Sequence, residues 1–326
     1  MSDILSLAAG NLISPIILSF VLGLVAALAR SDLTVPEAVA KGMSIYLLFA
    51  IGFKGGAGVA AHGVDATLIG TLVAAGVLSF GLPFVAFALL GVLTKLSTID
   101  KGAVAAHYGS ISIVTFVAAT SVLDSQGIMS EGYMVAAAAV MEAPAIVSAL
   151  WLIARKGEAG GKMDAGIYRE ILLNGSIVLL VGAFFIGIAT GQDGLDKISS
   201  FIVAPFQGVL CLFLLDMGLV AGRGLRESRG ELGGGAVLFG MLMPLVGSGF
   251  GLLAALVVGL SPGGAVLLMT LAASASYIAV PAAMRVALPE ARPSIYLTLS
   301  LGVTFPFNLT VGIPLYTALA TAIAGG

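Results

Sequence analysis

Two short polar patches interrupt apolar stretches of the sequence, and their residue types suit the binding of small ions. The first patch runs through Tyr108, Gly109, Ser110, Ile111 and Ser112, and the second through Ala273, Ser274, Ala275, Ser276 and Tyr277. Serine hydroxyls and unpaired backbone carbonyls are hard oxygen ligands, which a small alkali cation accepts. Unpaired backbone N–H groups at the start of a helix bind anions. The paired Ser-x-Ser patches therefore indicate a site where a cation and an anion bind close together.

Each patch lies midway along a stretch that is long enough to cross a membrane, residues 102–123 and residues 264–288. Both stretches begin with Gly-Ala-Val and both end with leucine. Matching interrupted segments in the two halves of a chain point to the binding site of a secondary transporter. Within a bilayer, irregular backbone persists only where it is buried in protein or lines a polar cavity. We therefore expect the two interruptions to share one cavity.

The two interrupted helices are expected to cross the membrane in opposite directions, so that the half-helix after each interruption begins near the midplane. Each of these N-termini carries roughly half a positive charge, and the C-terminus before each interruption carries the opposite partial charge. We therefore expect an anion at the paired N-termini and a cation at the carbonyls and hydroxyls. Such an anion site needs no Arg or Lys, which favours release of the substrate.

Two further polar residues lie beside prolines inside apolar segments. Glu142 stands two residues before Pro144, and Asn308 stands two residues after Pro306, which follows Pro144 by 162 residues. Ionisable groups inside a membrane segment are functional candidates because they are costly to insert. We expect Glu142 to bind the cation or to stabilise the exposed backbone of an interruption, and Asn308 to flank the site from the other half. The expected cation ligands are Ser110, Ser112, Glu142, Ser274, Ser276 and Asn308.

Each candidate also has a structural interpretation. Serine is common where membrane helices pack closely, so the pairing of the patches, rather than any single serine, supports a binding site. Tyr277 either packs or bonds to the substrate, and His107, just before the first patch, is either a packing residue with satisfied nitrogens or a substrate contact. Asp216 is expected to pair with a basic group such as Arg223.

The composition identifies the chain as a membrane protein. Of its 326 residues, 59% are hydrophobic and 10% are charged, and a mean hydropathy of +1.11 excludes a water-soluble globule. The net charge of -2 and the lack of basic runs argue against a nucleic-acid partner. Cys211 is the only cysteine, so no internal disulfide can form and a thiolate metal site is not expected. Residues 1–11 lack the basic region of a cleaved signal peptide, and we expect the first apolar segment to be retained.

Ten apolar segments are long enough to cross the membrane. They comprise residues 12–29, 36–53, 67–94, 102–123, 132–154, 170–190, 199–221, 232–259, 264–288 and 294–322. We predict an all-α polytopic fold of two five-helix repeats, residues 1–154 and 169–326, joined by a cytoplasmic linker over residues 155–168. Helices 4 and 9 carry the interruptions. Because each repeat has an odd number of crossings, the repeats must have opposite topology, which is an inverted repeat.

The distribution of Lys and Arg predicts how these helices are oriented. Cytoplasmic loops hold the excess of positive charge, and 13 of the 15 Lys and Arg fall in the loops on one side. Only Lys54 and Lys197 fall on the other side. Both termini are therefore expected outside, with the central linker in the cytoplasm.

The sequence resembles the sodium-dependent bicarbonate transporter family, which is widespread in bacteria. The resemblance rests on the His-Tyr-Gly-Ser-Ile-Ser string that begins at His107 and on residues 274–285, which read Ser-Ala-Ser-Tyr-Ile-Ala-Val-Pro-Ala-Ala-Met-Arg. It also rests on residues 305–316, which contain Phe-Pro-Phe-Asn and Gly-Ile-Pro-Leu-Tyr. The likeness covers essentially the whole chain.

This resemblance implies symport of bicarbonate with sodium by an elevator-like movement, with no catalytic residues and no cofactor other than sodium as the coupling ion. Helices 1, 2, 6 and 7 would form a gate or scaffold domain, and helices 3–5 and 8–10 a core domain. It also implies a homotrimer in the cell inner membrane and, in some relatives, a PII-like regulatory protein on the cytoplasmic face. The resemblance places bicarbonate and sodium at Ser110, Ser112, Ser274 and Ser276 with their flanking backbone. We therefore expect the bicarbonate site to comprise Gly109, Ser110, Ile111, Ser112, Ala273, Ser274, Ala275, Ser276 and Tyr277, and the sodium site to comprise the cation ligands given above.

Three other functions remain open at the level of sequence. A cation-coupled carrier of another small anion, such as a short carboxylate, would use the same residues. A passive anion channel would use the same helix N-termini but has no need of inverted repeats. An intramembrane enzyme would need a nucleophile with a neighbouring base; His107 and Ser110 are close in sequence, but the chain has no nucleophile elbow.

Overall fold

The chain is helical throughout the part that the structure describes. This structure is a computed structural model, and it describes residues 14–155, 175–227, 232–277 and 279–324. The predicted linker, residues 155–168, lies outside these ranges except for Arg155. The elements are α2 (Pro15–Leu28), α3 (Glu37–His62), α4 (Ala66–Leu93), α5 (Thr98–Gly109), α6 (Ile113–Ser125), α7 (Met134–Val140), α8 (Pro144–Arg155), α10 (Gly175–Ile202), α11 (Phe206–Glu227), α12 (Gly234–Val258), α13 (Pro262–Ala273), α14 (Ala279–Ala287), α15 (Pro293–Leu297), η1 (Thr298–Thr304), α16 (Phe305–Phe307), η2 (Asn308–Gly312) and α17 (Ile313–Ala324).

The prediction of an all-helical membrane protein is confirmed. Within the described ranges, eight helical stretches are long and apolar enough to span a membrane. They coincide with eight of the ten expected crossings. The other two expected crossings coincide with shorter apolar helices, α2 with 14 residues and α13 with 12 residues, whereas a full crossing takes about 20 residues.

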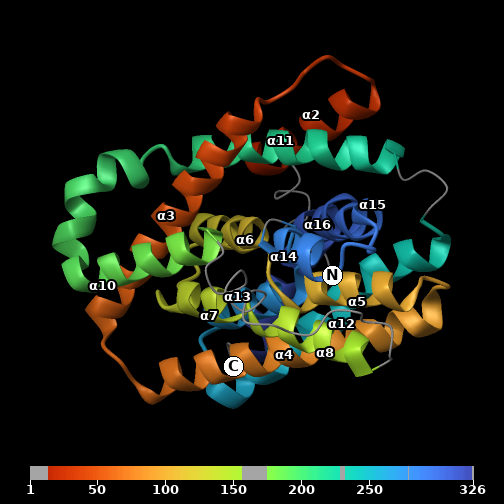
Figure 1. The fold of residues 1–326 in the computed structure, drawn as a ribbon. Helices are drawn as coiled ribbons and strands as arrows, with labels where there is room; N and C mark the ends of the chain where they lie inside the picture. The colour runs from red at the N-terminus through yellow and green to blue at the C-terminus, as the bar shows by residue number, and fades with distance from the viewer. Residues whose placement is uncertain (1–13, 156–174, 228–231, 278, 325–326) are drawn as a thin grey trace.

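Four helices form an outer layer, which lies along the top and left of Figure 1. In this layer α3 packs along α10 and α2 packs along α11. Glycines bring the backbones into contact: a side chain at Gly56 would collide with the carbonyl of Phe184, and one at Gly218 would collide with the carbonyl of Phe20. Small residues of this kind are the usual means of close packing between membrane helices. The outer layer therefore consists of two tightly joined helix pairs.

The remaining helices form an inner layer around two long helices, α4 and α12, which pack against each other. Each contains an internal proline, Pro83 in α4 and Pro244 in α12, which leaves a gap in the backbone hydrogen bonding. The interrupted helices pack on these two: α5 on α4, and α13 on α12. Gly109 at the end of α5 lies against the Pro83 ring and leaves no space for a side chain.

One helix extends beyond its expected end, and another is followed by a kink and a second helical part. The segment expected at 36–53 continues as α3 to His62, so Lys54 lies inside a helix and not in a loop. Close approach of Gly58 to the backbone of Gly132, with 3.1 Å left for a side-chain carbon, holds this extension against the start of α7. The segment expected at 170–190 ends close to its expected bound, because Gly191 takes a positive φ of 59° and bends the chain; a second helical part follows this kink and ends at Ile202.

The fifth and tenth expected crossings are also irregular. Helix α7 ends at Val140 and α8 begins at Pro144, so the residues between them, including Glu142, are not helical. In the tenth crossing, two π-helical segments, η1 and η2, flank the short helix that contains Pro306. Such π segments often occur at functional sites. The inner layer therefore has irregular backbone at four crossings, where the sequence predicted it at two.

Candidate ion and substrate site

The two predicted interruptions lie in direct contact in the middle of the inner layer. The backbone N–H of Ser112 donates to the hydroxyl of Ser274 at 2.9 Å, and the N–H of Ser276 donates to the carbonyl of His107 at 2.8 Å. All four residues are buried. Ser112 and Ser274 stand 162 residues apart in the sequence. The two interruptions are therefore joined directly by hydrogen bonds.

The first interruption is a short extended segment between α5 and α6. Ser110 has φ -82° and ψ 176°, which is extended backbone that ends α5. The Ser112 side chain caps α6 by accepting a hydrogen bond from Thr115 N at 3.2 Å, and it also accepts one from the Thr115 hydroxyl at 2.9 Å. One N–H group of this helix start is thus already bonded within the protein. The remaining capacity for an anion is smaller than a fully open N-terminus would provide.

The second interruption follows α13 in the same manner. Ser274 has φ -87° and ψ 166°, close to the values of Ser110. Its hydroxyl donates to the carbonyl of Leu271 at 2.9 Å and accepts from Ser112 N. Both bonding directions of this hydroxyl are used, so Ser274 joins the two interruptions. The Ser276 hydroxyl accepts a long hydrogen bond of 3.5 Å from Val280 N at the start of α14.

Glu142 lies where α7 gives way to α8, next to the first interruption. Its carboxylate accepts a hydrogen bond from the Ser110 hydroxyl at 2.8 Å, and only 7% of the residue is exposed. Among the described residues the single ion pair joins Asp100 and Arg292, so no basic group reaches Glu142. One donor leaves most of the lone pairs of a carboxylate unpaired. A buried carboxylate of this kind suits a bound cation.

Asn308 connects the tenth crossing to the second interruption. Its side-chain amide donates to the carbonyl of Ala273 at 2.9 Å, and its side-chain oxygen accepts from the Tyr316 hydroxyl at 2.9 Å. Asn308 is fully buried. The amide therefore holds the last carbonyl of α13 in place, and a carbonyl so oriented is available as an oxygen ligand through its second lone pair.

Two buried polar side-chain atoms in the described chain have no hydrogen-bond partner, and both flank the contact between the interruptions. They are Nε2 of His107 and the hydroxyl of Tyr277. The other nitrogen of His107 bonds to the carbonyl of Ala103 at 2.7 Å, and the ring stacks on Tyr296 with centroids 4.4 Å apart. Leaving a buried polar atom unpaired costs about 1–3 kcal/mol. These two atoms are suitably placed to bond to water or substrate.

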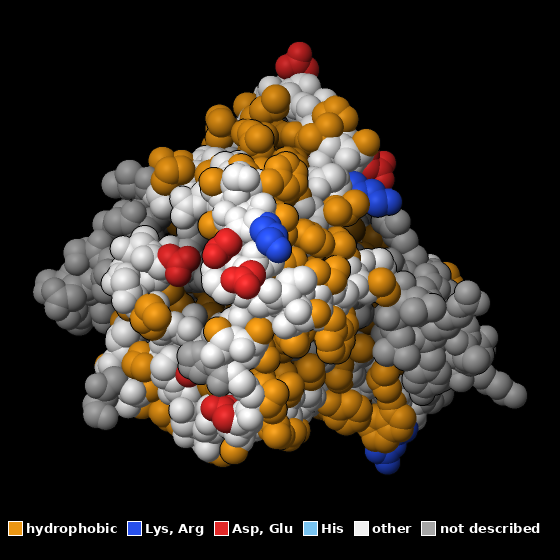
Figure 2. All heavy atoms as spheres, turned by 90° about the vertical axis from the view of Figure 1, so that its left-hand side faces the viewer, with side chains coloured by type: hydrophobic (Ala, Val, Ile, Leu, Met, Phe, Trp, Pro, Cys, Tyr) orange, Lys and Arg blue, Asp and Glu red, His pale blue; other side chains and the backbone are white. Residues whose placement is uncertain are grey.

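Two cavities lie near the central site, toward one end of the inner layer. A cavity of about 410 Å³ lies between the layers and is lined in part by Phe116, Val117 and Leu267, which lie one to two turns from the interruptions. A second cavity of about 540 Å³ includes Cys211 in its lining. Figure 2 looks onto this end, where acidic side chains outnumber basic ones.

At the opposite end the two layers are in contact, because η1 and α15 pack against α11. The side chain of Leu225 lies over Gly302 there. The space between the layers is therefore open toward one end and closed toward the other.

Comparison with protein families decides what kind of protein this is. Residues 15–321 match the model of the Na+-dependent bicarbonate transporter superfamily. The chain belongs to this superfamily. Among curated proteins, none matches the sequence.

Membership of the Na+-dependent bicarbonate transporter superfamily agrees with the resemblance found in the sequence and makes sodium the coupling ion. The structure brings Ser110, Ser112, Ser274, Ser276 and Glu142 into one region, with Asn308 on the carbonyl of Ala273. Their roles as ligands stay predictions. Asp216 and Arg223 form no direct ion pair in the described residues, but the charge of Arg223 does act on Asp216, as expected, while its guanidinium donates to the carbonyl of Leu33 at 3.1 Å.

Several residues around the site of this superfamily member were not selected from the sequence. Thr304 donates its hydroxyl proton to the carbonyl of Gly240 and therefore accepts the 2.6 Å hydrogen bond from the Tyr108 hydroxyl. Ser79 on α4 donates to the carbonyl of Met141, directly before Glu142. The repeat spacing was a usable signal for Thr304, because it stands 162 residues after Glu142.

Proposed function

We propose that this protein imports bicarbonate together with sodium and that both ions bind where the two interruptions meet. The observation that carries the proposal is the hydrogen bond between Ser112 and Ser274, which joins the two interruptions, beside a buried carboxylate that has no basic partner among the described residues. Irregular backbone in the interior of a membrane protein is the usual setting of transporter ion sites. The superfamily match supports the identity of the two ions.

In this proposal sodium lies at Glu142 and at the oxygens nearest to it. These oxygens are the hydroxyls of Ser110, Ser112, Ser274 and Ser276 and the carbonyls that end α5 and α13, one of them held by Asn308. A single carboxylate suits a monovalent ion, and among the described residues no cluster of three or more His, Cys, Asp or Glu side chains would hold a more highly charged metal. The cation also offsets the charge of the anion beside it.

Bicarbonate lies at the starts of α6 and α14 in the proposed arrangement. The backbone from Gly109 to Ser112 and from Ala273 to Tyr277 surrounds it, with the unpaired Tyr277 hydroxyl as a donor. The positive ends of the two half-helices supply attraction without a fixed charge. The substrate is therefore held by groups that release it readily when sodium leaves.

The proposal includes ten crossings in two inverted repeats. Support comes from the prolines of α4 and α12, Pro83 and Pro244, which stand 161 residues apart. The outer layer of α2, α3, α10 and α11 is the proposed scaffold and the inner layer the moving core. Alternating access requires each conformational state to open toward one side of the membrane only, and the cavities between the layers open toward one end. The count of Lys and Arg assigns the open end to the outside, and a trimer with a PII-like regulator remains an expectation from the resemblance.

Uptake of labelled bicarbonate into proteoliposomes tests the proposal directly. Uptake should require sodium outside and should stop when choline replaces it. Formate and acetate, offered as labelled alternatives, test whether a short carboxylate is the true substrate. Absence of sodium-dependent bicarbonate uptake, with formate or acetate carried instead, would reject bicarbonate as the substrate. Anion flux that does not depend on sodium would identify a passive channel.

A further inference from the structure

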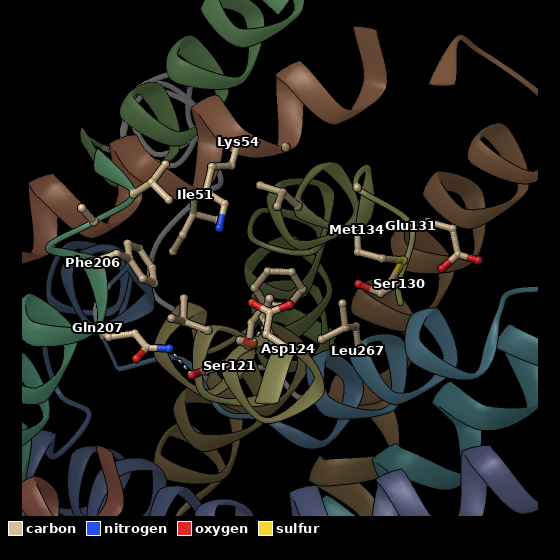
Figure 3. Close-up of a pocket in the computed structure, with 18 residues that line it drawn as sticks. Ile51, Lys54, Ser121, Asp124, Ser130, Glu131, Met134, Phe206, Gln207 and Leu267 are labelled. Atoms are coloured by element: carbon tan, nitrogen blue, oxygen red, sulfur yellow. Dashed lines mark hydrogen bonds between the residues drawn. The ribbon is translucent and has the colours of Figure 1, made fainter. Parts of the chain in front are cut away.

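Lys54 is a charged residue inside a membrane-spanning helix, and the central site does not use it. It lies in α3 within a 25-residue stretch that is apolar enough to span a membrane. Its side chain is exposed and points into the 410 Å³ cavity between the layers (Figure 3). The ammonium nitrogen lies 5.7 Å from the ring centroid of Phe206. Ionisable residues in such segments usually mark the path of an ion or a substrate.

The carboxylates of the cavity leave Lys54 available for an anion. Glu131 is engaged elsewhere, because it accepts hydrogen bonds from the backbone N–H and the hydroxyl of Ser261 at 2.7 and 3.0 Å. Asp124, on α6, also points into the cavity (Figure 3) but does not lie within ion-pair distance of Lys54. Among the described residues that line this cavity, Lys54 is the only basic one.

Neutral hydrogen-bonding groups also line this cavity. The side-chain amide of Gln207, on α11, donates to the hydroxyl of Ser121, on α6, at 3.4 Å. Thr120 lies on the same wall. An ammonium group with amide and hydroxyl donors nearby can bond to the oxygens of a small anion. These groups come from both layers, so the wall spans the space between scaffold and core.

The size of the cavity fits an anion that keeps part of its water. A water molecule occupies about 30 Å³ in the liquid, so a cavity of about 410 Å³ holds a small oxyanion with several waters. The anion therefore loses little hydration on entering, and a single lysine is sufficient to attract it. Asp124 on the far side limits the net positive charge, which keeps binding weak enough for the anion to move on toward Phe116 and Leu267.

We propose that Lys54, Gln207 and Ser121 form an entry site for a small monovalent oxyanion, separate from the site at the interruptions and reached before it. The entry site rests on the proposed function, because it supplies the substrate of the central site. Its role is to raise the local concentration of the anion in the cavity, an effect that charged clefts produce on a wide range of substrates.

The first test compares three variants in the uptake assay. Lys54→Gln should raise the bicarbonate concentration for half-maximal uptake about three- to tenfold, with the maximal rate and the sodium requirement nearly unchanged. Lys54→Arg should stay within about twofold of wild type because it keeps the charge. Lys197→Gln is the matched control, since Lys197 is exposed on α10 but does not line the cavity. Equal half-saturation in Lys54→Gln and wild type would overturn the entry site.

A second test needs no transport. An amine-reactive, membrane-impermeant reagent such as trinitrobenzenesulfonate is applied to the purified protein, and modification of Lys54 and Lys197 is measured in the same sample by mass spectrometry. Formate or nitrate at constant ionic strength should protect Lys54 in a saturable manner and leave Lys197 unaffected. Equal rates with and without the small anions would overturn the entry site.

The two tests separate this inference from the proposed function. If small anions protect Lys54 but the protein takes up no bicarbonate, the entry site exists and the protein carries another substrate. A protein that takes up bicarbonate with sodium, but in which Lys54→Gln behaves as wild type, has the central site alone. Asp124→Asn gives a check of opposite sign: removing the carboxylate should lower the half-saturating anion concentration, and a rise would contradict the electrostatic account.

Discussion

The four serines of the interruptions have different surroundings although the sequence presents them as two equal pairs. Ser110 donates to Glu142, Ser112 caps α6, and Ser274 uses both bonding directions to join the interruptions. Ser276 bonds across the contact through its backbone, since its N–H donates to the carbonyl of His107. The expected ligand function is therefore shared with structural bonds, which is common where a small site is built from few polar atoms.

Substitution of Glu142 tests the cation site most directly. Glu142→Gln keeps the hydrogen bond with Ser110 but removes the negative charge, so the sodium concentration for half-maximal uptake should rise about tenfold, equivalent to about 1.4 kcal/mol. The measurement is uptake against sodium concentration in proteoliposomes. Glu290→Gln, which changes an exposed acid, serves as the control. A changed bicarbonate affinity with an unchanged sodium requirement would assign Glu142 to the substrate or to structure.

Removal of two hydroxyls tests the contact between the interruptions. Ser110→Ala with Ser274→Ala should weaken transport while the protein remains folded and inserted. Loss of Ser274 also leaves the N–H of Ser112 unpaired, so unfolding should become easier by about 1–3 kcal/mol. Uptake at low substrate and thermal unfolding in detergent measure the two effects. Unchanged uptake at low substrate would show that these hydroxyls are not ligands.

The sequence predicted the polar centre of the site but not its surroundings. The patches, Glu142 and Asn308 were found because repeat spacing and the cost of burying polar groups are visible in one dimension. Tyr296, which stacks on His107, and Ser79, which bonds next to Glu142, come from distant helices. Nothing local to either residue reveals its neighbour, because helix packing brings them together. The unpaired Nε2 of His107 is likewise a property of the folded chain alone.

At the scale of elements, polar residues fix the outer ends of the interrupted helices. Ser97 caps α5, and Asp100 in its first turn pairs with Arg292 at 2.8 Å. Ser261 caps α13 and donates its hydroxyl to Glu131 at 3.0 Å. In each case the start of one interrupted helix is held by the loop before the fifth or tenth crossing of the other half. Both half-helices can therefore shift only together with the rest of the inner layer.

The sequence predicted which elements exist more accurately than where they end. The apolar runs gave every main helix of the described chain, but α3 extends well beyond its predicted end. Residues 54–62 contain three glycines and look like a loop; contact with the inner layer at Gly132 supports the helix there. Tertiary packing thus overrides weak local propensity.

The contact of Gly58 with Gly132 gives a test of movement between layers. Two glycines meet there without side chains, so α3 and the start of α7 have a smooth surface along which to slide. Gly58→Val should block this movement and reduce uptake at least tenfold while the protein still binds sodium. Gly42→Val on the same helix is the control, because nothing lies within 4 Å of a side chain there. Normal uptake by Gly58→Val would show that the layers do not slide at this point.

At the scale of the whole molecule, each layer is held together by close contacts of its own. Glycines bring backbones into contact in both layers, as Gly56 with Phe184 in the outer layer and Gly247 with Ala272 in the inner layer, and hydrogen bonds around the interruptions also join the inner layer. Between the layers lie cavities at one end, next to the contact of Gly58 with Gly132, and close contact at the other. Strong cohesion within each layer and sparse contact between them favour movement of one layer as a body relative to the other.

Cys211 can report movement between the two layers. It is the only cysteine of the chain, it is partly buried, and it lines the cavity between α11 of the outer layer and α6 of the inner layer. A thiol-reactive fluorophore would therefore label the unmodified protein at one known position. If the layers move, sodium and bicarbonate together should change the labelling rate by about threefold or more, whereas choline should not. A labelling rate that neither ion changes would place Cys211 outside the boundary between the moving layers. A rate that changes would make Cys211 a labelling site that reports transport in the protein without any engineered cysteine.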